Sequence, residues 1–425
     1  MVDLNDCFTS AKGRLTVGEA LERFTSGLNC VVTEESVPIS EILGRVLADD
    51  LKSDIQIPPR NNSAVDGYLT YFKDLNEDNE TRLPIAGRIA AGHPMSEKVV
   101  RGSAYQIFTG AQVPEGEEDM DPDTIYMLED VKTENGHVIL PPGQRLGANI
   151  RLRGEDVKIG DMVLRSGTML RPQHIGMVAS VGLPELRVRK KLRVAVFSTG
   201  DEIRDPGDEL APGAIYDINR FTVSAMLETL GCHVTDLGIF PDSLDVIQDG
   251  LARAAKGQDL IITSGGVSKG AEDYVRTAIE KLGALHTWNL LIKPGRPIAL
   301  GHIDESDRQV PFVGLPGNPV AVMVTFIKVA RPILMILSGA SNLEQNLYQV
   351  PAGFDFAKKA GRREWLRCRL QKDGDGRLYA IKYPNDGSGV LSSMVAADGL
   401  VELDENSKGV KVGQLVDFLP FSEVM

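Results

Sequence analysis

Strand-like and helix-like patterns of apolar residues alternate along residues 192–338. Three short apolar runs, each followed by a polar turn, predict buried strands at 193–197, 233–240 and 260–262. Helical spacing of apolar residues follows each run, at 217–231, 244–257 and 271–283. We expect Asp217 to be the N-cap and Gly231 the C′ residue of the first helix. The alternation predicts βαβ units and a parallel, doubly wound α/β sheet, which binds ligands beyond the carboxyl ends of its strands.

Other patterns predict elements on both sides of this segment. Helical spacing begins at Thr16 and again at Ser36, where Ser40 is the expected N-cap, and the prolines at 58 and 59 end the pattern. From 83 to 150, short β-like runs separated by glycine and proline predict a compact β domain, and a helix is expected from 172 to 181. From 342 to 425, alternating runs around DGDG and NDGSG turns predict a small β barrel or sandwich.

The composition limits the classes of partner. With 425 residues the chain is long enough for about three or four domains. A formal net charge of −13 argues against nucleic acid or an acidic membrane as partner, so an anionic ligand requires a local basic cluster. The N-terminus lacks the features of a signal peptide, and Lys328, Arg331 and Pro332 interrupt the most apolar run. The four cysteines form no CxxC pair, so we expect a soluble, cytoplasmic protein with reduced thiols.

The segment 259–273, DLIITSGGVSKGAED, predicts a strand, a glycine loop and the start of a helix. Glycines let the loop backbone, from Ser264 to Gly270, approach a ligand, and N–H groups at a helix N-terminus attract anions, so the loop suits a phosphate. Gly266 to Gly270 also matches GxSxG, the nucleophile elbow of serine hydrolases, with Ser268 as the nucleophile. That elbow requires its serine directly after the strand, whereas four residues intervene here, which favours the anion-binding interpretation. The sequence contains neither a P-loop nor a GxGxxG motif.

Three carboxylates follow predicted strands: Glu202, Asp242 and Asp273. At the carboxyl ends of parallel strands they would gather hard oxygen ligands at one sheet edge, as Mg²⁺ on a phosphorylated substrate requires. Taken singly, each is equally typical of a helix cap or a turn. Their shared placement favours the metal site.

Two further loops are expected at the same edge. KPGRP places Lys293 and Arg296 on a loop stiffened by prolines, and a lysine point charge with an arginine fork suits phosphate or another oxyanion. A solvated turn is the alternative. GLPGNP, at 314–319, follows the strand VPFV and precedes a long helix. In the N-terminal half, Asp66-Gly67 and Thr109-Gly110 are typical of turns as well as of ligand contacts, and the charged residues of 151–156 are typical of a surface ion-pair cluster.

Together these motifs resemble one known family. STGDE, IYDINR, TSGGVSKGAEDY, KPGRP and GLPGNPV, with NNSAVDGY, FTGAQVPEG and RLRGED, look like those of the molybdopterin molybdenumtransferases, the molybdenum insertases that include the E domain of gephyrin. The match covers essentially the whole chain in order and is weakest in the C-terminal domain. It implies an elongated homodimer of four domains, with an α/β domain like that of molybdopterin adenylyltransferases. The implied domains are a split elongated domain (11–57 with 151–190), an inserted β domain (58–150), an α/β molybdopterin-binding domain (191–340) and a C-terminal β barrel (341–425).

The resemblance also implies a reaction and its residues. Enzymes of this family take adenylylated molybdopterin and molybdate, cleave the pyrophosphate with Mg²⁺, leave molybdenum on the dithiolene and release AMP. Motif matching assigns catalytic roles to Asp66, Asp156, Glu202, Asp242, Asp273 and Lys293, and the metal to Glu202, Asp242 and Asp273. It assigns substrate-binding roles to Thr109, Pro316, Pro319, Arg367 and Ser388. The phosphate and oxyanion arguments add Ser264, Gly265, Gly266, Ser268 and Arg296 to the substrate-binding set.

The resemblance extends to partners. It implies a homodimer with a shared active site, into which Asp66 and Thr109 of one subunit reach, and a transient contact with a molybdopterin adenylyltransferase. Asn289 stands where some relatives carry a lysine, and we expect Arg296 to compensate for the lost charge.

Two functions from other classes remain as alternatives. One is a non-catalytic scaffold like the gephyrin E domain, which the complete set of carboxylates disfavours. The other is a nucleotide pyrophosphate hydrolase on the same α/β core, which would need neither the inserted β domain nor the C-terminal one.

Overall fold

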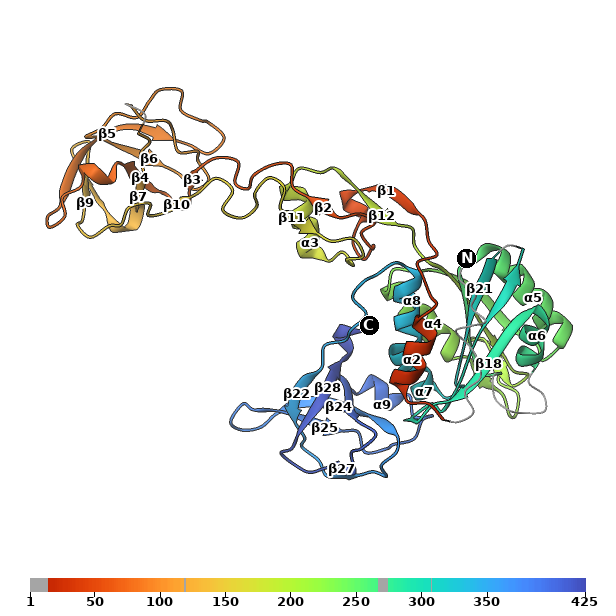
Figure 1. The fold of residues 1–425 in the computed structure, drawn as a ribbon. Helices are drawn as coiled ribbons and strands as arrows, with labels where there is room; N and C mark the ends of the chain where they lie inside the picture. The colour runs from red at the N-terminus through yellow and green to blue at the C-terminus, as the bar shows by residue number, and fades with distance from the viewer. Residues whose placement is uncertain (1–13, 118–119, 267–273, 307) are drawn as a thin grey trace. The chain divides into compact units, whose positions relative to one another are not determined.

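The computed structural model describes residues 14–117, 120–266, 274–306 and 308–425 (Figure 1). These residues form two compact units. The first, here called the β unit, comprises the described residues of 50–165 and 172–184. The second, called the α/β unit, comprises those of 1–49, 166–171 and 185–425. The division into four domains is finer than this and remains a prediction.

A six-stranded sheet in the order β7-β4-β6-β5-β9-β8 organises the β unit. Its strands are β4 (Gly67–Thr70), β5 (Thr81–Ile89), β6 (Ala104–Ile107), β7 (Thr124–Met127), β8 (Lys132–Glu134) and β9 (His137–Leu140). Smaller elements complete the unit: the ladders β2 (Leu51–Lys52) with β11 (Met162–Leu164) and β3 (Asn62–Ser63) with β10 (Ile150–Arg151), and the helix α3 (Pro172–Ser180). The predicted β region and the predicted helix near 172–181 are confirmed.

The α/β unit contains a second six-stranded sheet, in the order β16-β13-β17-β21-β20-β18. Its strands are β13 (Arg193–Thr199), β16 (His233–Phe240), β17 (Leu260–Ser264), β18 (Gly283–Asn289), β20 (Pro297–Glu305) and β21 (Arg308–Leu315). The first four strands in this order pair in parallel, as predicted. The expectation of a purely parallel sheet is wrong at β20, which pairs antiparallel with both neighbours. The connection from β20 to β21 is too short for a crossover, so those two strands form a hairpin.

Helices cover both faces of this sheet, which makes the doubly wound architecture. Alternate residues of β13 point to opposite faces: Val194 and Val196 pack in one apolar cluster, Ala195 and Phe197 in another. The first cluster includes residues of α2 (Val17–Thr25), α4 (Asn219–Thr229), α7 (Pro319–Thr325), the π-helical turn η4 (Phe326–Ala330) and α8 (Arg331–Leu337). The second includes α5 (Leu244–Gly257) and α6 (Tyr274–Leu282). The helix 319–337 is long and apolar enough to cross a membrane, but 78% of it is buried inside the structure, as in a core helix.

Local helix signals were right in some places and wrong in others. Thr16 caps α2, with a capping box to Glu19, and Gly231 follows α4 in the left-handed region at φ 78°. The N-cap of α4 is Ile218 rather than the predicted Asp217, whose buried carboxylate bonds both the backbone N–H and the guanidinium of Arg220.

The second predicted N-terminal helix, with Ser40 as its N-cap, is wrong. The segment instead forms β1 (Glu34–Pro38), a short 3-10 turn (Ile39–Glu41) and a bend at Gly44. Strand β1 pairs antiparallel with β12 (Glu185–Arg189). Pro38 cannot donate a helical hydrogen bond, and the distant partner strand decides the conformation.

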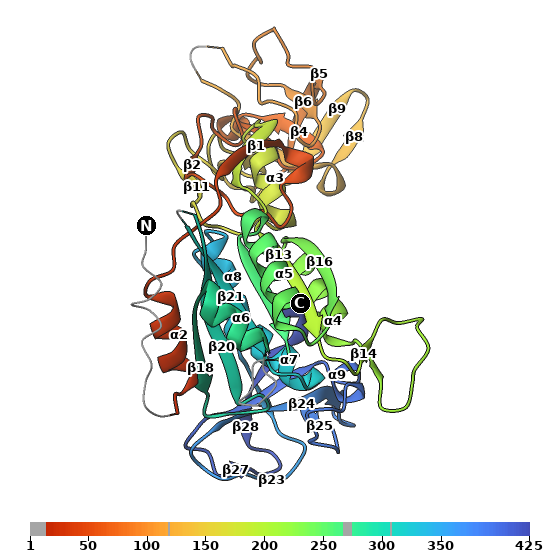
Figure 2. The same ribbon diagram turned by 90° about the vertical axis from the view of Figure 1, so that its right-hand side faces the viewer.

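The C-terminal region forms a third sheet, in the order β19-β24-β26-β28-β22, with β25 also paired to β24. Its strands are β22 (Tyr348–Pro351), β24 (Arg363–Lys372), β25 (Leu378–Lys382), β26 (Gly399–Leu403) and β28 (Leu415–Pro420). The first strand, β19 (Ile292–Lys293), comes from the loop between β18 and β20 and pairs in parallel with the start of β24. Figure 2 shows this sheet and the short helix α9 (Ser392–Val395) beside α7. The predicted β region is confirmed, and its pairing with β19 fixes the KPGRP loop against it.

A buried ion cluster also joins the helical layer to the C-terminal sheet. Glu402 of β26 accepts from Lys328 of η4 (2.8 Å), from the indole of Trp365 (2.8 Å) and from Arg363 (2.6 Å). The side chains of Lys328 and Glu402 are only 11% and 9% exposed. Burial raises the pKa of Glu402, but Lys328 and the other two donors lower it further, to below its ordinary value.

Candidate active site

The carboxyl ends of β13 and β16 bring acidic and hydroxyl groups together. Thr199 at the end of β13 donates to Asp242, which follows β16, with 2.6 Å between the oxygens. The backbone N–H of Asp201 donates to the same carboxylate at 3.3 Å, and the N–H of Asp242 donates back to Asp201 at 3.4 Å. Glu202 is exposed, and its carboxylate lies against Gly200, where a Cβ would meet it at 2.7 Å. Predicted residues Glu202 and Asp242 therefore lie on neighbouring strand ends.

The described part of the glycine loop has a backbone that only glycine accommodates. Gly265 and Gly266 have φ values of 83° and 63°. A Cβ at Gly266 would lie 2.9 Å from side-chain carbons of Thr199 and Val275. The N–H of Gly265 donates to the carbonyl of Leu315 at 3.0 Å, which ties this loop to the start of GLPGNP. Ser268 and Asp273, also predicted for the site, lie outside the described residues.

The KPGRP and GLPGNP loops contact each other. Gly295 has φ 88°, and a Cβ there would stand 2.7 Å from Thr325 and 3.3 Å from Pro316. Pro319 occupies the first turn of α7, where its missing N–H costs nothing. The Asn219 side chain donates to the carbonyl of Gly317 at 2.7 Å, which anchors the same loop to α4.

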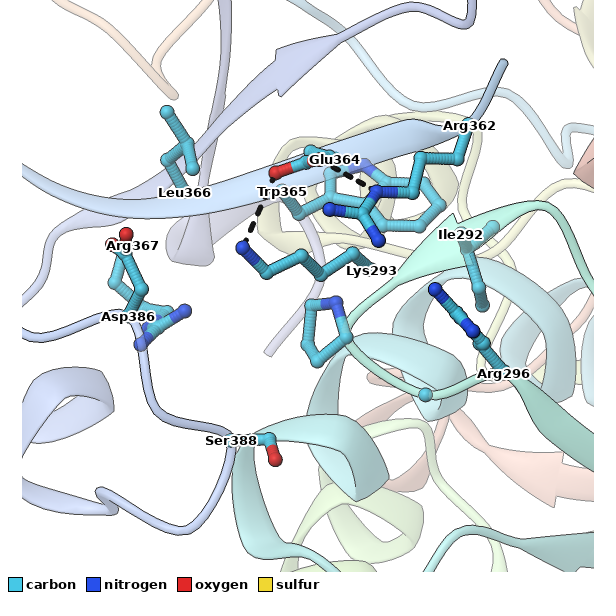
Figure 3. Close-up of a pocket in the computed structure, with 12 residues that line it drawn as sticks. Ile292, Lys293, Arg296, Arg362, Glu364, Trp365, Leu366, Arg367, Asp386 and Ser388 are labelled. Carbon is cyan, nitrogen blue, oxygen red and sulfur yellow. Dashed lines mark hydrogen bonds and ion pairs between the residues drawn. The ribbon is translucent and has the colours of Figure 1, made fainter. Parts of the chain in front are cut away.

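A cavity of about 290 Å³ opens between the KPGRP loop and the C-terminal sheet (Figure 3). It is lined by Ile292, Lys293, Pro294, Gly295, Arg296, Arg362, Glu364, Trp365, Leu366, Arg367, Asp386 and Ser388. Four of these side chains are cationic and two are acidic, so four minus two leaves a charge of +2 in a chain of net charge −13. The cavity brings together four residues that were predicted from three separate segments of the sequence: Lys293, Arg296, Arg367 and Ser388.

A buried carboxylate organises the cations on one wall of the cavity. Glu364 of β24 is 1% exposed and pairs with Arg362 at 2.7 Å and with Lys293 at 3.5 Å. Figure 3 shows both cations directed at this carboxylate. Because β19 pairs with β24 in register, Lys293 lies opposite Glu364 in the ladder. Lys293 remains 38% exposed, so its ammonium group can still contact a ligand.

Arg367 supports the opposite wall through the loop that carries Ser388. This buried guanidinium donates to the carbonyls of Asn385 (2.9 Å) and Gly387 (3.2 Å) and to the hydroxyl of Ser393 (3.0 Å). Burial lowers the pKa of Arg367 from its ordinary value, and the guanidinium stays charged at neutral pH. The carbonyl of Ser388 accepts from the N–H of Val320 in α7 at 3.0 Å. The loop is therefore fixed at both ends.

The three remaining predicted residues belong to the β unit. Asp66 accepts from the backbone N–H of Thr109 at 2.8 Å and from its hydroxyl at 2.7 Å. These two bonds, the backbone one first, lower the pKa of Asp66 from its ordinary value. Two residues predicted from motifs 43 positions apart thus form one hydrogen-bonded pair. Asp156 is exposed, and its backbone N–H bonds the carbonyl of Ile57.

Comparison with known proteins identifies the family. Three family models match in order: the MoeA N-terminal region (domains I and II) at 15–182, a probable molybdopterin binding domain at 195–335, and the MoeA C-terminal region (domain IV) at 349–421. A molybdopterin molybdenumtransferase of Haemophilus influenzae is 35% identical over 413 residues, which cover 97% of this chain and 100% of the relative. The chain belongs to this family of transferases.

Other members agree with this assignment. A molybdopterin molybdenumtransferase of Nostoc sp. is 31% identical over 76% of this chain and 73% of its own length. The crystal structure of a molybdopterin biosynthesis moeA protein from Pyrococcus horikoshii covers 96% of this chain and all of its own, with a TM-score of 0.79 at 28% identity. The predicted family and the predicted multidomain α/β and β fold of the transferase are confirmed.

Sequence reasoning missed two residues of the transferase cavity, Arg362 and Glu364, and one at the strand ends, Asp201. The first two lie in GRREWLRCRL, which was interpreted only as a strand. The available signal was a glutamate between arginines, and the structure buries it with the rest of the run from Glu364 to Cys368. A buried charge of this kind requires a partner, and the partner is a site residue. Asp201 lies inside the quoted STGDE motif and was passed over for Glu202.

The donor set at the strand ends suits a hard cation. Asp201, Glu202 and Asp242 offer carboxylate oxygens, the ligands that Mg²⁺ prefers. Among the described residues, no group of three or more His, Cys, Asp or Glu side chains lies close enough together to hold a metal ion. The predicted set also included Asp273, which lies outside the described part of the chain.

Proposed function

We propose that this transferase performs the metal-insertion step of molybdenum cofactor synthesis. It takes adenylylated molybdopterin and molybdate, cleaves the phosphoanhydride bond and releases AMP with molybdenum-bearing molybdopterin. The names of the relatives support molybdenum cofactor synthesis. The observation that carries the step itself is the cationic cavity, which joins the KPGRP loop, β24 and Ser388 in one place.

The cavity has the properties that a molybdate substrate requires. Molybdate is a small tetrahedral dianion without apolar surface, so its binding depends on cations and hydrogen-bond donors. Lys293, Arg296 and Arg362 supply charge around the cavity, and the hydroxyl of Ser388 supplies a donor. Glu364 offsets part of that charge, which keeps the cations together when the site is empty of substrate. Arg367 positions the Ser388 loop.

The strand ends would hold the metal and the phosphates. Glu202 and Asp242, with Asp273, would bind Mg²⁺, which neutralises the charge that the pyrophosphate carries and develops during cleavage. Asp201 holds Asp242 in place, because the backbone N–H of each residue donates to the carboxylate of the other. The backbone of Ser264 to Gly266 would contact a phosphate group, since the glycines leave the approach open. The link between Gly265 and Leu315 keeps this loop beside GLPGNP, with Pro316 and Pro319 as its stiff members.

The proposed reaction is tested by following AMP. The full chain is incubated with adenylylated molybdopterin and Mg²⁺, with and without molybdate. Our proposal predicts AMP release that depends on molybdate and that needs more molybdate in Lys293→Ala, while the exposed Lys408→Ala behaves as wild type does. AMP release at the same rate without molybdate would identify a pyrophosphate hydrolase instead. No release under any condition, with intact binding of a partner protein, would favour the scaffold.

We further propose a cytoplasmic homodimer whose active sites are shared between subunits. The Asp66–Thr109 pair is preorganised and exposed, although neither residue serves the core of the β unit. In a twofold dimer a reach into the partner occurs twice. Asp66→Ala and Asp273→Ala homodimers should each be nearly inactive, whereas isolated heterodimers should recover roughly half of the activity, because one of their two sites is intact. Heterodimers without any recovery would mean that Asp66 serves its own subunit or that the two sites are coupled. A transient contact with a molybdopterin adenylyltransferase, which would deliver the substrate, belongs to the same proposal.

A further inference from the structure

A second cavity lies beside the first and is not explained by the insertion reaction. It has a volume of about 240 Å³ and is lined by Arg14, Leu290, Leu291, Ile292, Arg296, Lys359, Ala360, Gly361 and Arg362. Arg296, Arg362 and Ile292 line both cavities. The other six lining residues belong to the second cavity alone.

The lining of this second cavity is cationic without any acid. It contains three arginines and one lysine and neither aspartate nor glutamate. The chain as a whole has more acidic than basic residues, 59 against 46, so a group of four cations without an acid is unusual for it. Among the described residues, Arg362 pairs with Glu364, whereas no ion pair joins Arg14, Arg296 or Lys359 to a carboxylate. Four cations gathered this way repel one another unless an anion joins them.

The walls of the cavity are held by main-chain hydrogen bonds. The N–H of Leu291 donates to the carbonyl of Leu15 at 2.7 Å, next to Arg14. The N–H of Arg363 donates to the carbonyl of Leu291 at 2.8 Å, next to Arg362, and the N–H of Gly361 donates to that of Glu405 at 2.7 Å. Three chain segments that lie far apart in sequence are thus fixed around one small space. The main chain that carries the cations is therefore already in place when a ligand arrives, so part of the ordering cost of binding is already met.

We propose that this cavity is a second oxyanion site, which binds a free inorganic tetrahedral oxyanion such as phosphate or molybdate. Guanidinium forks recognise tetrahedral oxygens in pairs, and three of the four cations are arginines. The volume is below the range usual for drug-sized ligands, which suits a small ion. Because the two cavities share Arg296 and Arg362, an anion in one lowers the affinity of the other. The second site thereby tunes how tightly the first holds its substrate.

Binding stoichiometry of the full chain tests the second site without any turnover. Inorganic phosphate is titrated calorimetrically at constant ionic strength into wild type, Arg14→Gln, Lys359→Gln and the matched surface control Lys408→Gln. We expect wild type to bind one phosphate ion in the second cavity, in addition to any phosphate bound at the sites proposed for the insertion reaction. Arg14→Gln and Lys359→Gln should each weaken the binding of this ion by at least about tenfold without weakening the binding of the others, since each removes a charged donor. Lys408→Gln should bind as wild type does.

A parallel titration with AMP separates the free ion from a phosphate monoester. If Arg14→Gln weakens AMP but not inorganic phosphate, the cavity belongs to the nucleotide and the proposal is wrong. A single phosphate site that responds to Lys293→Gln and ignores Arg14→Gln and Lys359→Gln also overturns it. That last result would leave the proposed insertion reaction standing, because AMP release is measured separately. Arg14 and Lys359 are both exposed, and thermal melting of each variant verifies its fold.

Discussion

Arg367→Lys separates the charge of this residue from its geometry. The wild-type guanidinium makes three hydrogen bonds, two to carbonyls of the loop that leads to Ser388 and one to Ser393. A lysine keeps the positive charge next to the cavity. Its single nitrogen cannot take the place of both guanidinium nitrogens, since Nε donates to Ser393 and Nη2 donates to the two carbonyls. The loop then loses its support while the electrostatic attraction for an anion stays.

The size of the effect follows from the bonds lost. Two charge-assisted hydrogen bonds at about 1.5–3 kcal/mol each give a loss of about 3–6 kcal/mol if the acceptors stay buried. The loop adjoins the cavity, so water can replace some of the lost hydrogen bonds. The loop can also open, which exposes the freed carbonyls to water, so the loss in free energy is smaller than this sum. An effective change of about 1.4–2.8 kcal/mol would leave the binding-competent loop populated tenfold to a hundredfold less. The dissociation constant for molybdate should therefore rise by about tenfold to a hundredfold.

Equilibrium dialysis with molybdate and hydrogen exchange together check this reasoning. Arg367→Lys should show the weaker binding together with faster exchange of the N–H groups in 385–391. Arg369→Lys is the matched control, since Arg369 is exposed on the same strand and makes one long bond, to Gln371 at 3.3 Å. It should change neither quantity. Wild-type molybdate affinity in Arg367→Lys would show that the charge alone matters and that the loop is not held in the way we describe.

Three further predictions follow from the same structure. Lys293→Ala should raise the molybdate concentration for half-maximal AMP release, because one cation leaves the cavity; an unchanged value would make Lys293 a solvated turn residue. Asp242→Asn should abolish molybdate-dependent AMP release with its fold intact, and full turnover at low Mg²⁺ would remove it from the metal set. Glu402→Gln should lower the free energy of unfolding by about 3–5 kcal/mol, since Lys328 stays buried without its main partner. Glu405→Gln, at the edge of the cluster, should lower it by about 1 kcal/mol or less. Urea unfolding followed by tryptophan fluorescence measures both. The pKa of Glu402 is lower in the folded than in the unfolded protein, so the ionised carboxylate stabilises the fold at neutral pH. This stabilisation is lost as the pH falls below 4.5 and through the pKa of the folded state. In Glu402→Gln, the free energy of unfolding should therefore fall less steeply with decreasing pH in this range.

Short-range patterns predicted most of the elements of the fold. The helical pattern that begins at Thr16, the strand runs of β13, β16 and β17 and Gly231 at the end of α4 each depend on neighbouring residues, and each prediction was right. The failures depend on distant partners. Residues 34–38 form a strand because 185–189 pair with them, and nothing near Ser40 shows this. Strand β20 runs antiparallel because it pairs with β18 and β21, and a pattern of apolar runs does not reveal the direction in which strands pair.

The candidate site shows the same division. Residue types at predicted strand ends pointed to Glu202 and Asp242, and those of the KPGRP loop pointed to Lys293. The grouping of Lys293 with Arg367 and Ser388 required the pairing of β19 with β24, which joins residues about seventy positions apart. Glu364 was missed because both faces of β24 are buried at that point, so no alternation marked it, and Arg362 precedes the strand. A glutamate flanked by arginines was the one local clue.

The central claim is that the cavity between the KPGRP loop and the C-terminal sheet binds the molybdate that is inserted. Anomalous scattering from a crystal of the full chain soaked in molybdate locates the metal directly. Our account predicts a peak inside the cavity, within contact distance of Lys293 and the Ser388 hydroxyl, that disappears in Lys293→Ala crystals. A molybdenum peak only outside this cavity, with the cavity filled by water at the same molybdate concentration, would contradict it.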